Sequence, residues 1–145
     1  MPYYDHPRAA VTADVALFAG SSDARKVLLI LRGNEPFVGS WALPGGFVDE
    51  GELVEDAARR ELLEETGVRW DDALTQVGAY GDPGRDPRGW TVSVVWTAHV
   101  GDVVLDAVGG DDAAKAEWYA VADLPALAFD HNRIVSDALD RVQSI

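Results

Sequence analysis

The most constraining feature of the chain is the segment 52–66, in which nearly every residue is a strong helix former. Asp49 lies three residues before Glu52, which is the spacing of a capping box at the start of a helix. Gly67 follows the segment, at the position where helices commonly end in a left-handed residue. The sequence therefore predicts a well-delimited helix here, with Asp49 as its N-terminal cap.

Three glutamates of this segment, Glu61, Glu64 and Glu65, fall within about 100° of one another on a helical wheel. They border the apolar stripe that contains Leu62 and is expected to face the core. A solvated acidic face is the simpler interpretation of a glutamate-rich helix. Like charges at these spacings destabilise a helix, however, and confinement beside a core increases their repulsion unless a cation lies between them. Because all the ligand atoms would be oxygens, the pattern favours Mg²⁺ or Mn²⁺.

A double glycine precedes the helix, in the stretch Pro44, Gly45, Gly46. Glycine has no Cβ atom, so the backbone at this point can approach a ligand or a metal closely. A glycine pair by itself is more often a turn than a site. We expect this pair to belong to a site because it stands at a fixed offset before the acidic helix.

The rest of the chain shows strand and helix patterns in turn, which favours a layered α/β fold. The segments 9–19 and 26–32 are predicted to form a hairpin, and 33–46 is predicted to be a loop because of its Gly, Pro and Asn content. The other predicted elements are strands at 73–80, 90–100 and 117–121 and a helix at 132–142. No repeat or long linker divides the chain, so we expect one domain over residues 1–145.

Charge and cysteine content narrow the possible functions. The chain has 25 acidic and 12 basic residues and a formal net charge of −13. This balance argues against binding to nucleic acid or to an anionic membrane through a basic face, because such binding depends on Lys and Arg. Without cysteine there is no thiol nucleophile, disulfide or Cys-ligated zinc site. The N-terminus lacks an apolar signal segment and no window is long enough for a membrane span, so we expect a soluble, cytoplasmic protein.

The loop and the helix together form one pattern, which consists of Gly46, Glu52, the run 60–65 (Arg-Glu-Leu-Leu-Glu-Glu) and Gly67. This pattern resembles the Nudix box at its defining positions, and the run 41–46 resembles the usual approach to that box. The resemblance extends over nearly the whole chain. It implies the Nudix fold, an α/β/α sandwich with a mixed β-sheet, the box loop and helix, and a C-terminal helix.

The resemblance to Nudix hydrolases also implies an activity and a set of site residues. Members of the family hydrolyse a nucleoside diphosphate linked to another group, with a water nucleophile and Mg²⁺ ions on the box helix. The implied metal ligands are Glu61, Glu64, Glu65 and the carbonyl oxygen of Gly45. Glu52 and Arg60 match the pair that orients the loop against the helix, and Gly46 allows the substrate to come close.

The resemblance leaves the catalytic base open. Glu64 and Glu65 are the candidates within the box for deprotonating the water. Some family members take the base from a loop outside the box, and an acidic stretch occurs here at 110–117. The simplest interpretation of that stretch is a solvated loop. Its reserve candidates for the base are Asp111, Asp112 and Glu117.

The loop 81–89 (Gly-Asp-Pro-Gly-Arg-Asp-Pro-Arg-Gly) is the most informative segment for the substrate. In an otherwise acidic chain, Arg85 and Arg88 offer forked donors that suit a phosphate or a ribose. The loop resembles that of Nudix ADP-ribose pyrophosphatases, and Pro83 matches the proline that marks this subfamily. The resemblance implies cleavage of ADP-ribose to AMP and ribose 5-phosphate, with Asp82, Pro83 and the two arginines at the substrate.

Other substrates and functions stay open as alternatives. NADH, nucleotide sugars, dinucleoside polyphosphates or, as in MutT-like enzymes, oxidised nucleoside triphosphates would suit the same box. A non-catalytic ADP-ribose-sensing module is less favoured, because the box is intact and we expect no appended DNA-binding domain. The resemblance also implies a homodimer, with the N-terminal segment 2–8 as a candidate for exchange between subunits.

Aromatic and histidine side chains carry a weaker signal. The aromatic candidates for stacking on a nucleobase, each more often a packing residue, are Phe37, Trp41, Tyr80 and Trp90. None of the three histidines has a metal-ligand spacing, so we assign them no catalytic role. The sequence 130–132, which contains His131, is expected to cap the last helix.

Overall fold

The computed structural model describes residues 4–102 and 105–143. Its centre is a seven-stranded mixed sheet in the order β3 (Trp41–Ala42), β2 (Lys26–Arg32), β1 (Ala10–Ala19), β6 (Thr91–His99) and β5 (Thr75–Tyr80). Two more strands lie off this path: β4 (Gly45–Phe47) pairs with β1, and β7 (Ala113–Ala120) pairs with β2. Short 3₁₀ turns at Ser22–Ala24 and Val121–Asp123 flank β2 and β7.

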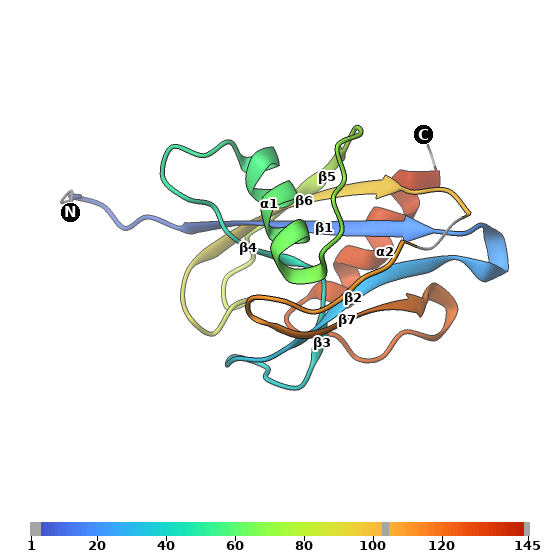
Figure 1. Cartoon of the computed structure of the whole chain (residues 1–145). Helices are drawn as coiled ribbons and strands as arrows, with labels where there is room; N and C mark the ends of the chain where they lie inside the picture. Colours follow the sequence, from blue (N-terminus) through green and yellow to red (C-terminus); the bar gives the residue numbers. More distant parts are fainter. Residues whose placement is uncertain (1–3, 103–104, 144–145) are drawn as a thin grey trace.

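Two helices cover opposite faces of this sheet (Figure 1). Helix α1 (Val54–Thr66) packs Leu62 into a core that contains Val15, whereas α2 (His131–Gln143) packs Ile134 into a core that contains Phe18. Successive side chains of a strand point to opposite faces, so odd and even positions of β1 serve different helices. The predicted α/β/α sandwich with a mixed sheet and a C-terminal helix is confirmed.

The central strand β1 changes its antiparallel partner along its length. Near its end it pairs with β2, through Phe18 opposite Val27, and near its start it pairs with β4, through Asp14 opposite Gly45. Its other edge pairs with β6 in parallel along the whole strand. Strands β2 and β4 therefore diverge on one side of β1, and side chains from all three strands line the space between them.

The start of α1 differs from the expectation. The helix begins at Val54 and its N-cap residue is Leu53, which makes no side-chain capping bond. Asp49 does not cap the helix: its backbone N–H donates to the Glu52 carboxylate at 3.0 Å. Glu52 lies outside the helix because its side chain is held by this amide and by Arg60. The predicted C-terminus at Gly67 is confirmed, since this residue adopts φ 72° and donates its N–H to Leu63.

Two strand predictions also need correction. The predicted loop 33–46 contains β3 and the start of β4, which are too short to show a periodic pattern. Strand β7 begins at Ala113, earlier than the predicted 117, because it pairs with β2 along nearly its whole length. This alanine-rich stretch has low intrinsic strand propensity, so pairing with a neighbour decides its structure.

The N-terminal segment 2–8 is described only in part. Positions 2 and 3 of the N-terminal segment lie outside the described residues, and within the described part the Arg8 guanidinium stacks 3.4 Å from the centroid of the Tyr4 ring. Among residues 4–102 and 105–143, no helix has the length and the apolar character needed to cross a bilayer.

Candidate active site

A cleft of about 420 Å³ opens where β2 and β4 diverge from β1. Its walls come from these strands, from the box helix α1, and from the loops around residues 33–35, 85–88 and 129–131. Elements that are distant in sequence thus meet at one hollow.

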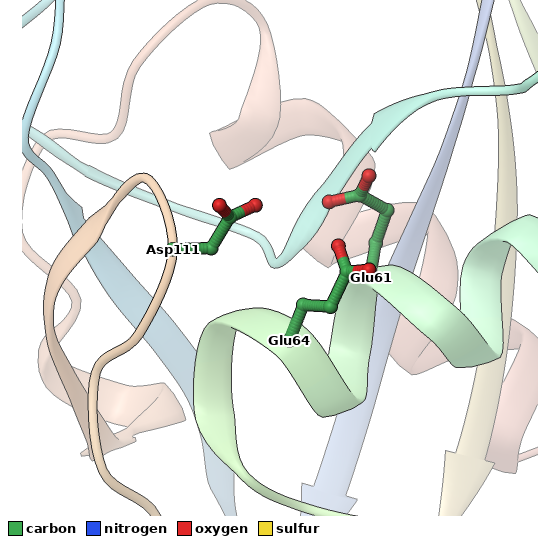
Figure 2. Close-up of side chains that lie close together, drawn as sticks. All are labelled: Glu61, Glu64 and Asp111. Atoms are coloured by element: carbon green, nitrogen blue, oxygen red, sulfur yellow. The ribbon is translucent and has the colours of Figure 1, made fainter.

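A cluster of three carboxylates lies beside this cleft (Figure 2). Oxygen atoms of Glu61, Glu64 and Asp111 all lie within 4.8 Å of one another. Two come from successive turns of α1, and Asp111 points towards them from the loop before β7. Asp111 has φ 52°, a left-handed conformation that is uncommon outside glycine. The cluster provides only oxygen donors, close enough together to share one hard divalent cation such as Mg²⁺.

Glu65, the third glutamate of the predicted face, lies deeper than the other two. Its side chain is 4% exposed, and one carboxylate oxygen accepts the backbone N–H of Gly45 at 2.7 Å. Burial raises the pKa of Glu65 to about 8, although the Gly45 hydrogen bond opposes the shift. Burial likewise raises the pKa of Glu61. The environment of these two acids therefore disfavours their charged forms, and a bound cation would stabilise those forms.

The double glycine is needed because β4 lies against two acidic side chains. A Cβ atom on Gly46 would lie 2.6 Å from the carboxylate carbon of Glu61, well inside van der Waals contact. A Cβ atom on Gly45 would overlap the Asp14 carboxylate and lie 2.6 Å from the carbonyl oxygen of Ala13. The absence of side chains on β4 is what lets its backbone reach the carboxylates.

Arg60 links the loop before α1 to the carboxylates on the helix. Its guanidinium donates to Glu52 at 2.8 and 3.0 Å and to the carbonyl oxygen of Phe47 at 3.1 Å. It also contacts Glu61 at 2.8 Å and Glu64 at 3.3 Å. Its hydrogen bonds lower the pKa of Glu52 to about 2, so Glu52 stays charged. The guanidinium partly neutralises the carboxylates and fixes the loop geometry.

The two arginines of the loop 81–89 both line the cleft, but their partners differ. Arg85 is almost buried, with a side chain 5% exposed, and forms a forked pair with Asp130 at 2.6 and 2.9 Å. It also donates to the Ser93 hydroxyl at 2.8 Å. Arg88 also forms a forked pair, with the buried Asp86 at 2.8 and 3.1 Å, but its side chain is 39% exposed. The two arginines are thus both paired, and they differ in that Arg85 is almost buried whereas Arg88 is open to the cleft.

Other predicted residues are spread between the cleft and the surface. Asp112 lines the cleft and accepts a hydrogen bond from Asn34 at 3.0 Å. Asp82 pairs with Arg133 at 3.1 Å, and neither it nor Pro83 is among the residues that line the cleft. Glu117 is an exposed residue of β7, outside both the carboxylate cluster and the cleft lining.

Two buried residues of the cleft wall were missed by the sequence reasoning. Asp14 lies in the middle of the apolar strand β1, and burial raises its pKa to about 7 against the opposing charge of Arg85. A lone aspartate in a buried strand is itself a signal, because unpaired Asp is rarely buried. His131 accepts the backbone N–H of Leu43 through Nδ1 at 3.0 Å, and burial lowers its pKa to about 4. No local sequence signal pointed to that pairing.

Comparisons with known proteins show the family to which the chain belongs. The NUDIX domain family matches residues 8–139. An ADP-ribose pyrophosphatase of Methanocaldococcus jannaschii is 43% identical over 92% of this chain and 74% of that protein. A crystal structure of the NUDIX domain of Shewanella oneidensis NrtR complexed with ADP ribose has a TM-score of 0.85 and 35% identity, covering 96% of this chain and 93% of that one.

A regulatory protein is also similar. The ADPR responsive transcriptional repressor NtrR of Acinetobacter baylyi is 35% identical over 97% of this chain. The chain spans only 57% of the length of that repressor. The similarity therefore concerns one part of a larger regulator.

We predict that Gly46→Ala destabilises the protein and disturbs the carboxylate cluster, because the added Cβ would collide with Glu61. Overpacking of this kind costs about 1–3 kcal/mol, which denaturant unfolding measures. The rise in melting temperature on adding Mg²⁺ should also shrink. Gly78→Ala is the control, because nothing lies within 4 Å of its Cβ position. Equal effects of the two substitutions would contradict the proposed close approach.

We also predict that the stability of the metal-free protein falls as pH rises from 6.5 to 8. The pKa of Glu65 is raised from 4.5 to about 8 and that of Asp14 from 3.8 to about 7. At pH 6.5 His131 is neutral in the folded protein and about half protonated in the unfolded chain. The protons held by Glu65 and Asp14 in the folded state outweigh this difference, so the folded protein binds more protons overall. Stability must then decrease with pH. Melting temperatures in EDTA test this, and Glu65→Gln should flatten the slope; a rising melting temperature in wild type would contradict it.

Proposed function

This chain belongs to the Nudix family of hydrolases, and from that premise we propose that it hydrolyses ADP-ribose to AMP and ribose 5-phosphate in a Mg²⁺-dependent reaction. The observation that carries the proposal is the oxygen-only cluster of Glu61, Glu64 and Asp111 beside a cleft that also contains arginine side chains. A diphosphate needs both features, since its negative charge must be neutralised while a water attacks.

The proposed metal ligands are Glu61 and Glu64, as the sequence predicted, joined by Asp111. Glu65 and the carbonyl oxygen of Gly45 are further proposed ligands, as the family resemblance implies. Mn²⁺ would suit the same oxygen donors. When bound, the ion would supply charge neutralisation for the diphosphate and activation of the attacking water.

The protein's own residues would position the reactants. Arg60 and Glu52 hold the loop before α1 in place, and the hydrogen bond from Gly45 fixes the Glu65 carboxylate. Among the candidate bases, Glu65 lines the cleft next to Glu61 and Glu64 on the same helix, where its carboxylate could accept a proton from the attacking water. Glu64 and Asp112 are the alternatives, because Glu64 belongs to the cluster and Asp112 lines the cleft.

Two relatives support ADP-ribose as the ligand. One is named as an ADP-ribose pyrophosphatase, and the other was crystallised with ADP ribose. In this chain Arg85 and Arg88 line the cleft, as expected for contacts to a phosphate or a ribose. NADH, nucleotide sugars, dinucleoside polyphosphates and MutT-type triphosphates are the alternative substrates.

The second candidate function is ADP-ribose sensing without turnover, and the similarity to an ADPR responsive repressor favours it. The carboxylate cluster supports catalysis over sensing, because binding alone does not need three converging acids. A small-molecule substrate, a homodimer, a cytoplasmic location and the absence of nucleic-acid binding stay predictions from the sequence.

We predict that Glu64→Gln and Glu65→Gln each lower kcat for ADP-ribose by about a hundredfold or more, because each removes a proposed metal ligand or base. Phosphatase-coupled phosphate release measures the rate, with and without Mg²⁺. Glu50→Gln is the matched control, since Glu50 is an exposed acid of the preceding loop. Wild-type rates in both the Glu64 and the Glu65 variants would contradict the assigned site.

We further predict that the products are AMP and ribose 5-phosphate, identified by chromatography and mass spectrometry. Release of inorganic pyrophosphate from a nucleoside triphosphate at a higher kcat/KM would favour the MutT-like alternative. Tight binding of ADP-ribose with no turnover in Mg²⁺ would instead favour the sensing function.

A further inference from the structure

Arg32, at the end of β2, lines the cleft and is half-buried. Its Nε donates to the carbonyl oxygen of Pro36 at 2.6 Å. Within the described parts of the chain, its guanidinium forms no ion pair with a carboxylate. Arg85 and Arg88, the other arginines of the cleft, both have such pairs. Arg32 therefore presents to the cleft a positive charge that is paired with no carboxylate of residues 4–102 and 105–143.

Arg32 and Arg88 are held near the same aromatic ring. The guanidinium carbon of Arg32 lies 5.1 Å from the centroid of Phe129, and that of Arg88 lies 5.6 Å from it. Arg88 also lies 4.8 Å from the Phe47 centroid. Burial, and then the charge of Arg88, lowers the pKa of Arg32 below its usual value. Two like charges are thus kept close together in a partly desolvated place.

The backbone that carries this ring is itself unusual. Phe129 has φ 53° and Phe37, which packs edge-on against it at 4.8 Å, has φ 61°. Bulky residues rarely adopt positive φ, and such strain clusters at binding sites. With Asp111 of the carboxylate cluster, they are the non-glycine residues of positive φ in the described parts of the chain. Phe129 lines the cleft, Phe37 packs against Phe129, and Asp111 precedes Asp112, which also lines the cleft.

Paired guanidinium groups of this kind suit one class of ligand. Arginine presents a planar fork of donors that matches the oxygens of a phosphoryl group, and a bound anion relieves the repulsion between two cations. Arg85 is less suited to this role, because Nε and Nη2 donate to Asp130, Nη1 donates to Ser93, and the side chain is only 5% exposed. Arg88 also donates to Asp86 through Nε and Nη2, but its side chain is 39% exposed.

We propose that Arg32 and Arg88 together bind one phosphoryl group of the substrate, with Phe129 holding the two guanidinium groups side by side. This inference rests on the proposed nucleoside diphosphate substrate and adds Arg32 to its binding residues. Arg85 is a positioning residue: it ties the loop 81–89 to Asp130 at the start of α2 and to Ser93 in β6.

The test is calorimetric binding of ADP and of adenosine, with Mg²⁺ present, to wild type, Arg32→Gln, Arg88→Gln and the double variant. ADP contains the diphosphate that every candidate substrate shares, and adenosine lacks it. Loss of a charge-assisted contact should weaken ADP binding about tenfold in each single variant and leave adenosine binding unchanged. If both guanidinium groups bind the same phosphoryl group, the fold-loss of ADP affinity in the double variant should be smaller than the product of the two single fold-losses.

Controls separate a direct contact from a general effect. Arg69→Gln removes a positive charge from an exposed pair with Asp71 and should change ADP affinity less than twofold. Arg32→Lys keeps the charge without the fork and should fall between wild type and Arg32→Gln. This variant also serves if melting curves show that Arg32→Gln does not fold.

Three results would overturn the proposal. The first is an ADP affinity of Arg32→Gln equal to that of wild type, or of Arg32→Lys if only that variant folds. The second is equal weakening of ADP and adenosine binding, and the third is a loss of ADP affinity in the double variant equal to the product of the two single losses. Turnover of ADP-ribose is measured separately on wild type. The proposed hydrolysis can therefore fail while the phosphoryl site stands, or the reverse.

Discussion

The close packing of β4 against β1 and α1 is the contact on which the rest of the site depends. Gly45 and Gly46 lie against Asp14 and Glu61, and the Gly45 amide is hydrogen-bonded to Glu65. Any side chain on these two glycines would push the strand away from the carboxylates. The same displacement of β4 from β2 along β1 opens the cleft. One steric condition thus creates both the cavity and the acidic wall beside it.

That packing has an electrostatic consequence. Burial holds Asp14 and Glu65 at pKa values of about 7 and 8, so their charged forms are disfavoured in the metal-free protein. Arg60 supplies positive charge beside three other acids of this region, Glu52, Glu61 and Glu64. Part of the chain's negative charge is therefore concentrated at a place where a cation would be stabilising.

The sequence allowed the box helix, its C-terminus at Gly67 and the layered fold to be predicted, because these follow from local propensity and periodicity. It could not show that Asp111 joins Glu61 and Glu64, since that contact depends on how the loop before β7 folds back. Arg85 was correctly expected in the loop, but its pairing with Asp130 joins positions 45 residues apart. Local sequence patterns indicated the segments that contain candidate site residues, whereas tertiary contacts determine which of their side chains lie together.

Carboxylates and arginine side chains lie at different places around the cleft. Carboxylates gather where α1 and the loop before β7 meet, whereas Arg32 and Arg88 gather around Phe129. An anionic ligand is repelled by the first group unless a cation intervenes, and it is attracted by the second without one. Asp86 accepts hydrogen bonds from both Nε and Nη2 of Arg88, whereas the Nε of Arg32 donates to a carbonyl oxygen, so Arg32 is the main source of positive charge at this end of the cleft.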